Sequence, residues 1–361
     1  MRCCLLLVLS LGCNTGTDEA TDQPAPLADP GLPGVHSVGT FATTLPGVLG
    51  DDTPLQVWYP TAESTGVKHR YDHFFDGIAL DHPAPDCETT HPVIVFSHGN
   101  SGVRWQSYPI VERMVSHGYI VVAPDHVGNS LGSPSQPFVD VLFRRPLDVA
   151  WSFDQAVSMP DLNGCIDPDA GYAAMGHSFG GYTTLVVAGA EIVRADVQAL
   201  CDDGASGACD ALAKWDEDHE PTARMRMADD RVWAAVALSP WDAGVLASGV
   251  DAIQVPTLIV TGSRDETTPL MPMVQSMYDG LSVEPRALAT FPEGGHFSFI
   301  YGCGFVGDGD GCGEDWVPLE DVRDATVGVA LPWLGLASGD DRNGQYLPSE
   351  HPDMQWTSTG L

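Results

Sequence analysis

The chain has 361 residues, of which 43% are hydrophobic. This length is enough for one large domain with its own core, and this hydrophobic fraction is too high for a disordered chain. The formal net charge of −33 excludes nucleic acid as a partner and leaves membrane contact only through a lipid anchor, because an acidic surface repels phosphate backbones and anionic lipid.

The first 13 residues are typical of an export signal. A basic start precedes an apolar run over residues 5–11, and small residues follow. The end of this segment resembles a bacterial lipobox, whose cysteine, here Cys13, carries lipid after cleavage, although Ser10 stands where the motif usually has an apolar residue. Residues 14–34 have the composition of a flexible tether. We therefore expect an exported protein, either a cell-envelope lipoprotein or a secreted one.

Six further cysteines fit an oxidising compartment, where they would pair. Two pairs are close in sequence, and each would close a loop rich in Gly and Asp; the third pair is left by elimination. Six cysteines allow fifteen pairings, so other connectivities remain open. None has the CxxC spacing of a zinc or redox site. The favoured pairs are Cys201–Cys209, Cys303–Cys312 and Cys87–Cys165.

Strand and helix patterns alternate along residues 35–338, which predicts one α/β domain with a mainly parallel, doubly wound sheet and helices on both faces. The expected strands cover residues 55–59, 92–96, 119–123, 172–175, 232–238, 257–260 and 286–291, and the expected helices cover 105–117, 146–157 and 181–190, with Pro146 in the first turn of the second helix.

The alternation breaks at about residues 191–230, a charged stretch that contains glycine. We interpret it as an insertion after the preceding helix, and both a lid over the site and an inert surface excursion remain open. The polar residues 339–361 are expected to form an irregular tail. We expect a monomer.

Residues 176–180 read Gly-His-Ser-Phe-Gly, which fits the G-x-S-x-G pattern. The pattern follows an expected strand and precedes an expected helix, the context in which a nucleophilic serine projects from a strained turn. The helix N-terminus offers free N–H groups to a developing oxyanion. Ser178 is therefore the candidate nucleophile.

A serine needs a base, and in this architecture the acid and the base follow in the order Ser, Asp, His. Asp265 follows the expected strand 257–260, where ligand sites form in open α/β sheets. Glu266 is the competing acid. His296 follows the last expected strand and two glycines, and imidazole titrates near neutral pH. Asp265 and His296 complete the predicted triad.

Two further sets of residues are assigned to the site. The N–H of Asn100, in the loop after residues 92–96, and the N–H of Phe179 are the candidate oxyanion donors. Trp241, at the end of another strand, is a candidate for the acyl pocket. The acidic, Gly-rich loop that contains Asp308 and Asp310 lacks the full spacing of a calcium loop, so no metal is predicted.

These residues resemble the bacterial group of predicted dienelactone hydrolases in the α/β-hydrolase superfamily. They are also similar to platelet-activating-factor acetylhydrolases and to polyester-cleaving, cutinase-like enzymes. The resemblance covers about residues 40–335 apart from the insertion, and it rests on His98-Gly99-Asn100, the segment from Trp105 to His126, residues 176–181, Asp265 and Gly295-His296-Phe297.

The resemblance implies an α/β-hydrolase fold and serine-dependent cleavage of carboxylic esters without a cofactor. Dienelactone hydrolases proper use a cysteine where this chain has Ser178, so dienelactone is not the expected substrate. The expected partner is a small-molecule, lipid or polymer ester. The alternatives are an acyltransferase or a peptidase that uses the same triad, and a non-catalytic lipoprotein that binds at the cell surface.

Overall fold

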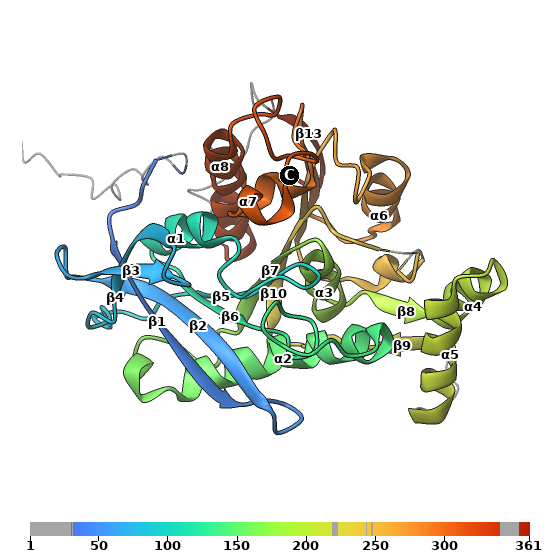
Figure 1. Ribbon diagram of the computed structural model, residues 1–361, viewed down its shortest axis with the longest axis horizontal. Coiled ribbons are helices and arrows are strands. Elements are labelled where there is room, and N and C mark those ends of the chain that lie inside the picture. Colours follow the sequence, from blue (N-terminus) through green and yellow to red (C-terminus); the bar gives the residue numbers. More distant parts are fainter. Residues whose placement is uncertain (1–29, 31, 219–222, 243, 247, 340–353) are drawn as a thin grey trace, which may run out of the picture.

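The computed structural model describes Pro30 and residues 32–218, 223–242, 244–246, 248–339 and 354–361 (Figure 1). The expected export signal with Cys13, and the expected tether up to residue 29, lie outside the described residues. None of the described helices is both long and apolar enough to cross a membrane.

Eleven strands form one sheet in the order β13-β12-β11-β10-β7-β5-β6-β2-β1-β4-β3. The six strands β12, β11, β10, β7, β5 and β6 are parallel to one another. At the two ends of this set, β13 pairs antiparallel with β12 and β2 pairs antiparallel with β6. The bounds are β1 Ser37–Pro46, β2 Asp52–Thr61, β3 Lys68–Tyr71, β4 Phe75–Asp81, β5 Val93–Ser97, β6 Ile120–Pro124, β7 Tyr172–His177, β10 Val232–Leu238, β11 Thr257–Gly262, β12 Arg286–Phe291 and β13 Gln355–Thr359.

The central strands are continuous apolar runs because both faces of the sheet are covered. Buried residues of α2 (Phe138–Ser158), α3 (Phe179–Val187) and α6 (Gln275–Gly280) pack in one core cluster. Buried residues of α1 (Tyr108–Ser116) and α8 (Leu319–Ala337) pack in a second cluster. The predicted doubly wound α/β architecture is therefore confirmed, with helices on both sides of the sheet (Figure 1).

The second expected helix begins earlier than predicted. Pro146 was expected in its first turn, but α2 begins at Phe138 and holds Pro146 in its interior. A proline there leaves the carbonyl of the residue four positions earlier without its helical donor. That residue is Leu142, whose carbonyl oxygen lies 3.5 Å from the hydroxyl oxygen of Tyr182 on α3 and accepts its hydrogen bond. A tertiary contact therefore offsets the loss, which the sequence pattern could not reveal.

The described residues of the insertion form helices and strands at one end of the molecule (Figure 1). It contains β8 (Glu191–Val193), α4 (Arg194–Asp202), α5 (Ser206–Asp218) and β9 (Arg224–Arg226), and β8 pairs with β9. Its Trp215 is buried in the same core cluster as α2. The insertion thus packs against the side of the domain.

The tail is not wholly irregular, contrary to the expectation. Gln355–Thr359 forms β13, which pairs antiparallel with β12. The segment contains Trp356 and three β-branched or hydroxyl residues that suit a half-buried strand, and its pairing covers the edge of β12.

Three disulfides connect Cys87 with Cys165, Cys201 with Cys209 and Cys303 with Cys312. These are the pairs that the sequence favours. The first joins segments 78 residues apart, and the other two close short loops. The bonds are compatible with an exported protein.

Candidate active site

Ser178 lies in the sharp turn between β7 and α3, with φ 58° and ψ −118°. This left-handed backbone is strained for a residue other than glycine. The flanking glycines allow the turn to pack against β5: a Cβ on Gly180 would lie 1.9 Å from the Ser97 carbonyl oxygen, and one on Gly176 would lie 2.5 Å from the Gly180 carbonyl oxygen. The G-x-S-x-G pattern therefore follows from close backbone packing.

Asp265 and His296 are brought together by loops that follow β11 and β12, two neighbouring parallel strands. The His296 Nδ1 atom lies 3.0 Å from an Asp265 carboxylate oxygen, and both side chains are buried. The Asp265 carboxylate also accepts hydrogen bonds from the Thr268 N–H (2.5 Å) and hydroxyl (2.7 Å). A carboxylate only accepts, so the proton of neutral His296 sits on Nδ1 and Nε2 carries none.

Ser178 and His296 both line a cavity of about 440 Å³ beside the carboxyl ends of the strands. Its walls are largely apolar and include Val103, Trp105 and Tyr301. Among the described lining residues there is no Asp, Glu, Lys or Arg. Such a cavity suits an uncharged organic group.

Asn100 lies in the loop after β5 and lines the same cavity, while Phe179 is the first residue of α3. Amides in the first turn of a helix have no intrahelical acceptor. The peptide that carries the Asn100 N–H is held at its other end, because the Gly99 carbonyl accepts from His98 Nδ1 at 2.7 Å. The His98 Nε2 atom accepts the backbone N–H of His126 at 3.0 Å, which places the ring proton on Nδ1.

A hydrogen-bonded chain links the loop after β5 to His296. The Gly99 N–H donates to Gln106 Oε1 (3.2 Å), and Gln106 Nε2 donates to His177 Nδ1 (3.2 Å). His177 Nε2 then donates to the carbonyl oxygen of His296 (2.9 Å). Burial is the main cause that lowers the pKa of His177 to about 3, so its ring is neutral at neutral pH. Gln106 and His177 thus connect the loops of the candidate site, and no sequence pattern indicated these contacts.

Asp310 joins the loops of the proposed acid and base. Its carboxylate accepts the N–H of His296 (2.9 Å), the N–H of Glu266 (2.9 Å), and the N–H (3.0 Å) and hydroxyl (2.6 Å) of Thr267. Asp310 lies in the loop closed by the disulfide between Cys303 and Cys312. In the sequence, this acidic loop resembles only an incomplete calcium-binding loop. No sequence pattern predicts that Asp310 joins the loops of Asp265 and His296. Glu266, the competing acid, contributes only its backbone to this cluster.

Trp241 is not among the described residues that line the cavity. Its ring packs instead edge-to-face against Phe138, Phe179 and Tyr182. Trp241 therefore packs on the α2 and α3 side of the core, and its assignment to an acyl pocket stays a prediction. Its strand-end position places its backbone beside Ser178, whose carbonyl accepts the Trp241 N–H at 2.9 Å.

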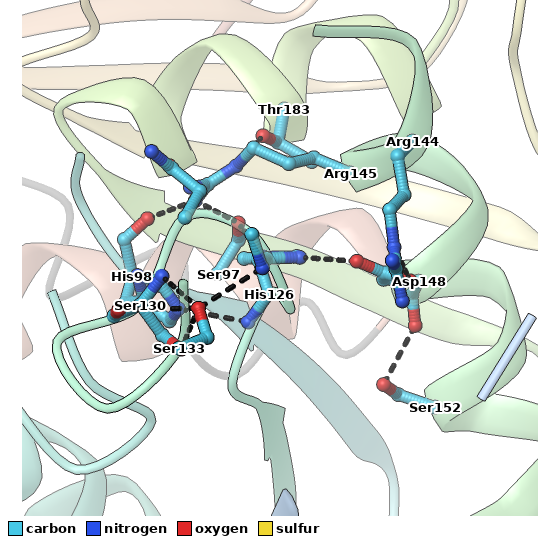
Figure 2. Close-up of polar contacts among 12 residues, drawn as sticks. Ser97, His98, His126, Ser130, Ser133, Arg144, Arg145, Asp148, Ser152 and Thr183 are labelled. Atoms are coloured by element: carbon cyan, nitrogen blue, oxygen red, sulfur yellow. Dashed lines mark hydrogen bonds and ion pairs between the residues drawn. The ribbon is translucent and has the colours of Figure 1, made fainter. Parts of the chain in front are cut away.

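A second Ser-His-Asp arrangement lies beneath the loop after β5 (Figure 2). Ser97 Oγ lies 2.9 Å from His126 Nε2, and His126 Nδ1 lies 2.9 Å from an Asp148 carboxylate oxygen. All three side chains are buried, and none lines the 440 Å³ cavity. Burial lowers the pKa of His126 and raises that of Asp148 to about 7. Ser97 is therefore closed off from the cavity that Ser178 lines.

Within the described residues, no three His, Cys, Asp or Glu side chains lie together in a way that could hold a metal ion. The carboxylate of Asp310, which could have been a ligand, is occupied by protein donors.

The family model described as Chlorophyllase matches residues 77–201. No curated protein matches the chain. The matched segment contains Asn100 and Ser178, whereas Asp265 and His296 lie beyond it. The fold and this match define the class: the chain has an α/β-hydrolase fold, and its similarity to chlorophyllases indicates a hydrolase that acts on esters.

Proposed function

We propose that this protein is a serine hydrolase that cleaves carboxylic esters through an acyl-enzyme, with Ser178, His296 and Asp265 as its triad. The observation that carries the proposal is the shared cavity: Ser178 and the His296 ring line it, while Asp265 binds the far nitrogen of that ring. The narrower resemblance to dienelactone hydrolase-like and platelet-activating-factor acetylhydrolase-like enzymes belongs to the same proposal.

In the first half of the reaction, His296 Nε2 takes the hydroxyl proton as Ser178 Oγ attacks the ester carbonyl. The N–H groups of Asn100 and Phe179 hold the oxyanion of the tetrahedral intermediate. When that intermediate collapses, the bond to the alcohol oxygen breaks and His296 gives its proton to the leaving alcohol. Asp265 keeps the ring oriented and stabilises its charged form.

In the second half, water replaces the alcohol. His296 takes a proton from the water as the water attacks the acyl-enzyme carbonyl, and it returns that proton to Ser178 as the acid leaves. The same triad would support transfer to another alcohol or cleavage of an amide. Product analysis with added alcohol, and assays on peptides, separate these alternatives from hydrolysis.

The decisive assay is hydrolysis of p-nitrophenyl butyrate by wild type, Ser178→Ala and Ser152→Ala. Ser152 is a matched control, because its hydroxyl is buried and donates to the carbonyl oxygen of Asp148 on its own helix (2.7 Å). We expect Ser178→Ala to lose activity by about 10⁴-fold or more with its circular dichroism unchanged, and Ser152→Ala to remain active. Full activity of Ser178→Ala would reject the proposal.

The substrate is best sought among uncharged esters, since the described cavity walls carry no acidic or basic side chain other than histidine. A screen of short-, medium- and long-chain esters should include chlorophyll, because of the matching family, and an aromatic polyester. A non-catalytic binding protein would hydrolyse none of them and would not react with a fluorophosphonate probe.

A further inference from the structure

Arg145 is a fully buried arginine of α2, and its guanidinium lies between the loop after β5 and the start of α3 (Figure 2). Its Nη2 atom donates to the carbonyl oxygen of His98 and to Ser97 Oγ (3.1 Å), and its Nε atom donates to the hydroxyl of Thr183 (3.1 Å). Its guanidinium carbon lies 4.6 Å from the centre of the Phe179 ring. One side chain therefore touches both segments that carry the proposed oxyanion donors.

A third arm reaches Asn100 itself. Arg145 Nη1 donates to the Asn129 side-chain oxygen at 2.6 Å, and Asn129 Nδ2 donates to the Asn100 side-chain oxygen at 2.8 Å. The arginine is thus connected to the residue whose N–H should face the substrate.

The four acceptors of Arg145 are neutral, and a chain of hydrogen bonds connects it to Asp148, whose carboxylate also pairs with Arg144 at 3.3 Å. Ser97 accepts from Arg145, so the Ser97 hydroxyl proton is available to His126 Nε2 (2.9 Å). His126 in turn donates from Nδ1 to Asp148 (2.9 Å). Each group in the chain from Arg145 to Asp148 can therefore donate one hydrogen bond to the next group, and no two donors face each other. Burial lowers the pKa of Arg145 to about 9, which leaves it charged at neutral pH.

We propose that Arg145 is a positioning residue for the oxyanion hole, which fixes the spacing of the Asn100 and Phe179 amides and is itself held by the relay through Ser97, His126 and Asp148. This inference rests on the proposed esterase function. Arg145 does not line the cavity, so it acts through the two backbone segments and not on the substrate.

A purely structural arginine would affect folding alone, so the test must separate stability from transition-state binding. The variants are Arg145→Lys and Arg145→Met. The matched control is Arg231→Met, because Arg231 also stacks on a ring, with its guanidinium carbon 5.0 Å from the Phe153 ring centre, but pairs with Asp229, and neither residue is among the described lining of the cavity.

For each folded variant, kcat and KM are measured with p-nitrophenyl butyrate, and Ki is measured for a trifluoromethyl ketone whose bound oxyanion occupies the same hole. We expect Arg145→Met to lower kcat by about 10- to 100-fold with KM changed by less than about threefold, since displacing the donors should cost less than deleting one of them. The Ki should rise by a similar factor. Arg145→Lys should lie between wild type and Arg145→Met, and Arg231→Met should keep both constants.

Unchanged kcat and Ki in folded Arg145→Met would overturn the inference, as would an equal loss in Arg231→Met. If Arg145→Met does not fold, Asn129→Ala removes one acceptor and keeps Arg145 in place with its other three, and it should lower kcat and raise Ki in parallel; no change in either would count against the proposal. Labelling of wild-type Ser178 by a fluorophosphonate distinguishes failure of this inference from failure of the esterase proposal. If the wild type is labelled and the Arg145 variants keep wild-type kcat and Ki, only this inference is rejected. If the folded wild type is not labelled, the esterase proposal is rejected.

Discussion

The ring of His177 donates a hydrogen bond from Nε2 to the carbonyl oxygen of His296, at 2.9 Å. The residue before the proposed nucleophile therefore holds the backbone of the proposed base. This contact and the bond from Gln106 to the opposite ring nitrogen require a neutral, Nε2-protonated imidazole. The first variable position of the G-x-S-x-G motif, His177, thus holds the backbone of His296 in this chain.

Stability should fall in acid because His177 is buried in its neutral form. Its folded-state pKa of about 3 is below the ordinary value of 6.5, so the unfolded chain takes up the proton first as pH falls. Its contribution is fully present above about pH 6.5 and is lost progressively as pH falls toward 3. We therefore expect the free energy of unfolding, measured with urea, to fall between pH 7 and pH 4.5 in the wild type. In His177→Gln this fall should be smaller by about 2 kcal/mol. An identical pH dependence in the two proteins would show that His177 does not titrate as described.

Asp310→Ala should impair catalysis, because it removes the acceptor that joins the His296 N–H to the loop of Asp265. We expect kcat to fall by about tenfold, and unfolding free energy to fall by about 1–3 kcal/mol because several N–H groups lose their partner. The matched control is Asp308→Ala, an exposed residue of the same disulfide loop. Enzyme kinetics and thermal unfolding measure both effects. Equal behaviour of the two variants would contradict the clamp assigned to Asp310.

The two short-range disulfides should differ in their effect on activity. Replacing Cys303 and Cys312 with serine frees the loop that carries Asp310, so it should lower both kcat and stability. Replacing Cys201 and Cys209 acts on the insertion and should lower stability alone. Closing a loop of this size contributes about 2–3 kcal/mol in the chain-entropy model. Kinetics of the two double variants, with thiol titration as control, test the difference. A loss of activity in the variant without Cys201 and Cys209 would contradict the prediction and would give the insertion a role in the site.

Tyr301 should influence substrate size, because its ring lines the cavity and packs edge-to-face against Phe75. Tyr301→Ala enlarges the cavity, so the ratio of kcat/KM for p-nitrophenyl octanoate over butyrate should rise by about tenfold. Trp241→Phe should leave this ratio unchanged, since Trp241 lies outside the described cavity wall. A larger shift in the Trp241 variant would place the acyl group on the α3 side.

Much of the fold could be predicted from local pattern. Buried runs such as Val93–Ser97 and Val232–Leu238 are strands because only a doubly covered parallel sheet accommodates them. The position of α2 could not be predicted, because Pro146 is tolerated there through Tyr182, a residue distant in sequence. The strand at Gln355–Thr359 also depends on a distant partner, the edge of β12.

The candidate site divides in the same way. The roles proposed for Ser178, Asp265 and His296 follow from strand ends and chain order, which the sequence displays. The contacts of Asp310 and Arg145 depend on loops that meet only in three dimensions, and neither residue belongs to a recognisable motif. The pocket role of Trp241 stays a prediction, because a strand-end position does not determine which way a ring points.

The most direct measurement is the site of modification by a fluorophosphonate, found by peptide mapping and mass spectrometry. Among the described residues, Ser97 also lies in a Ser-His-Asp arrangement, but its side chain is buried and does not line the cavity, whereas Ser178 does. The account predicts a single adduct on the peptide that contains Ser178, lost in Ser178→Ala. An adduct on the peptide that contains Ser97, or no adduct on the folded protein, would contradict it.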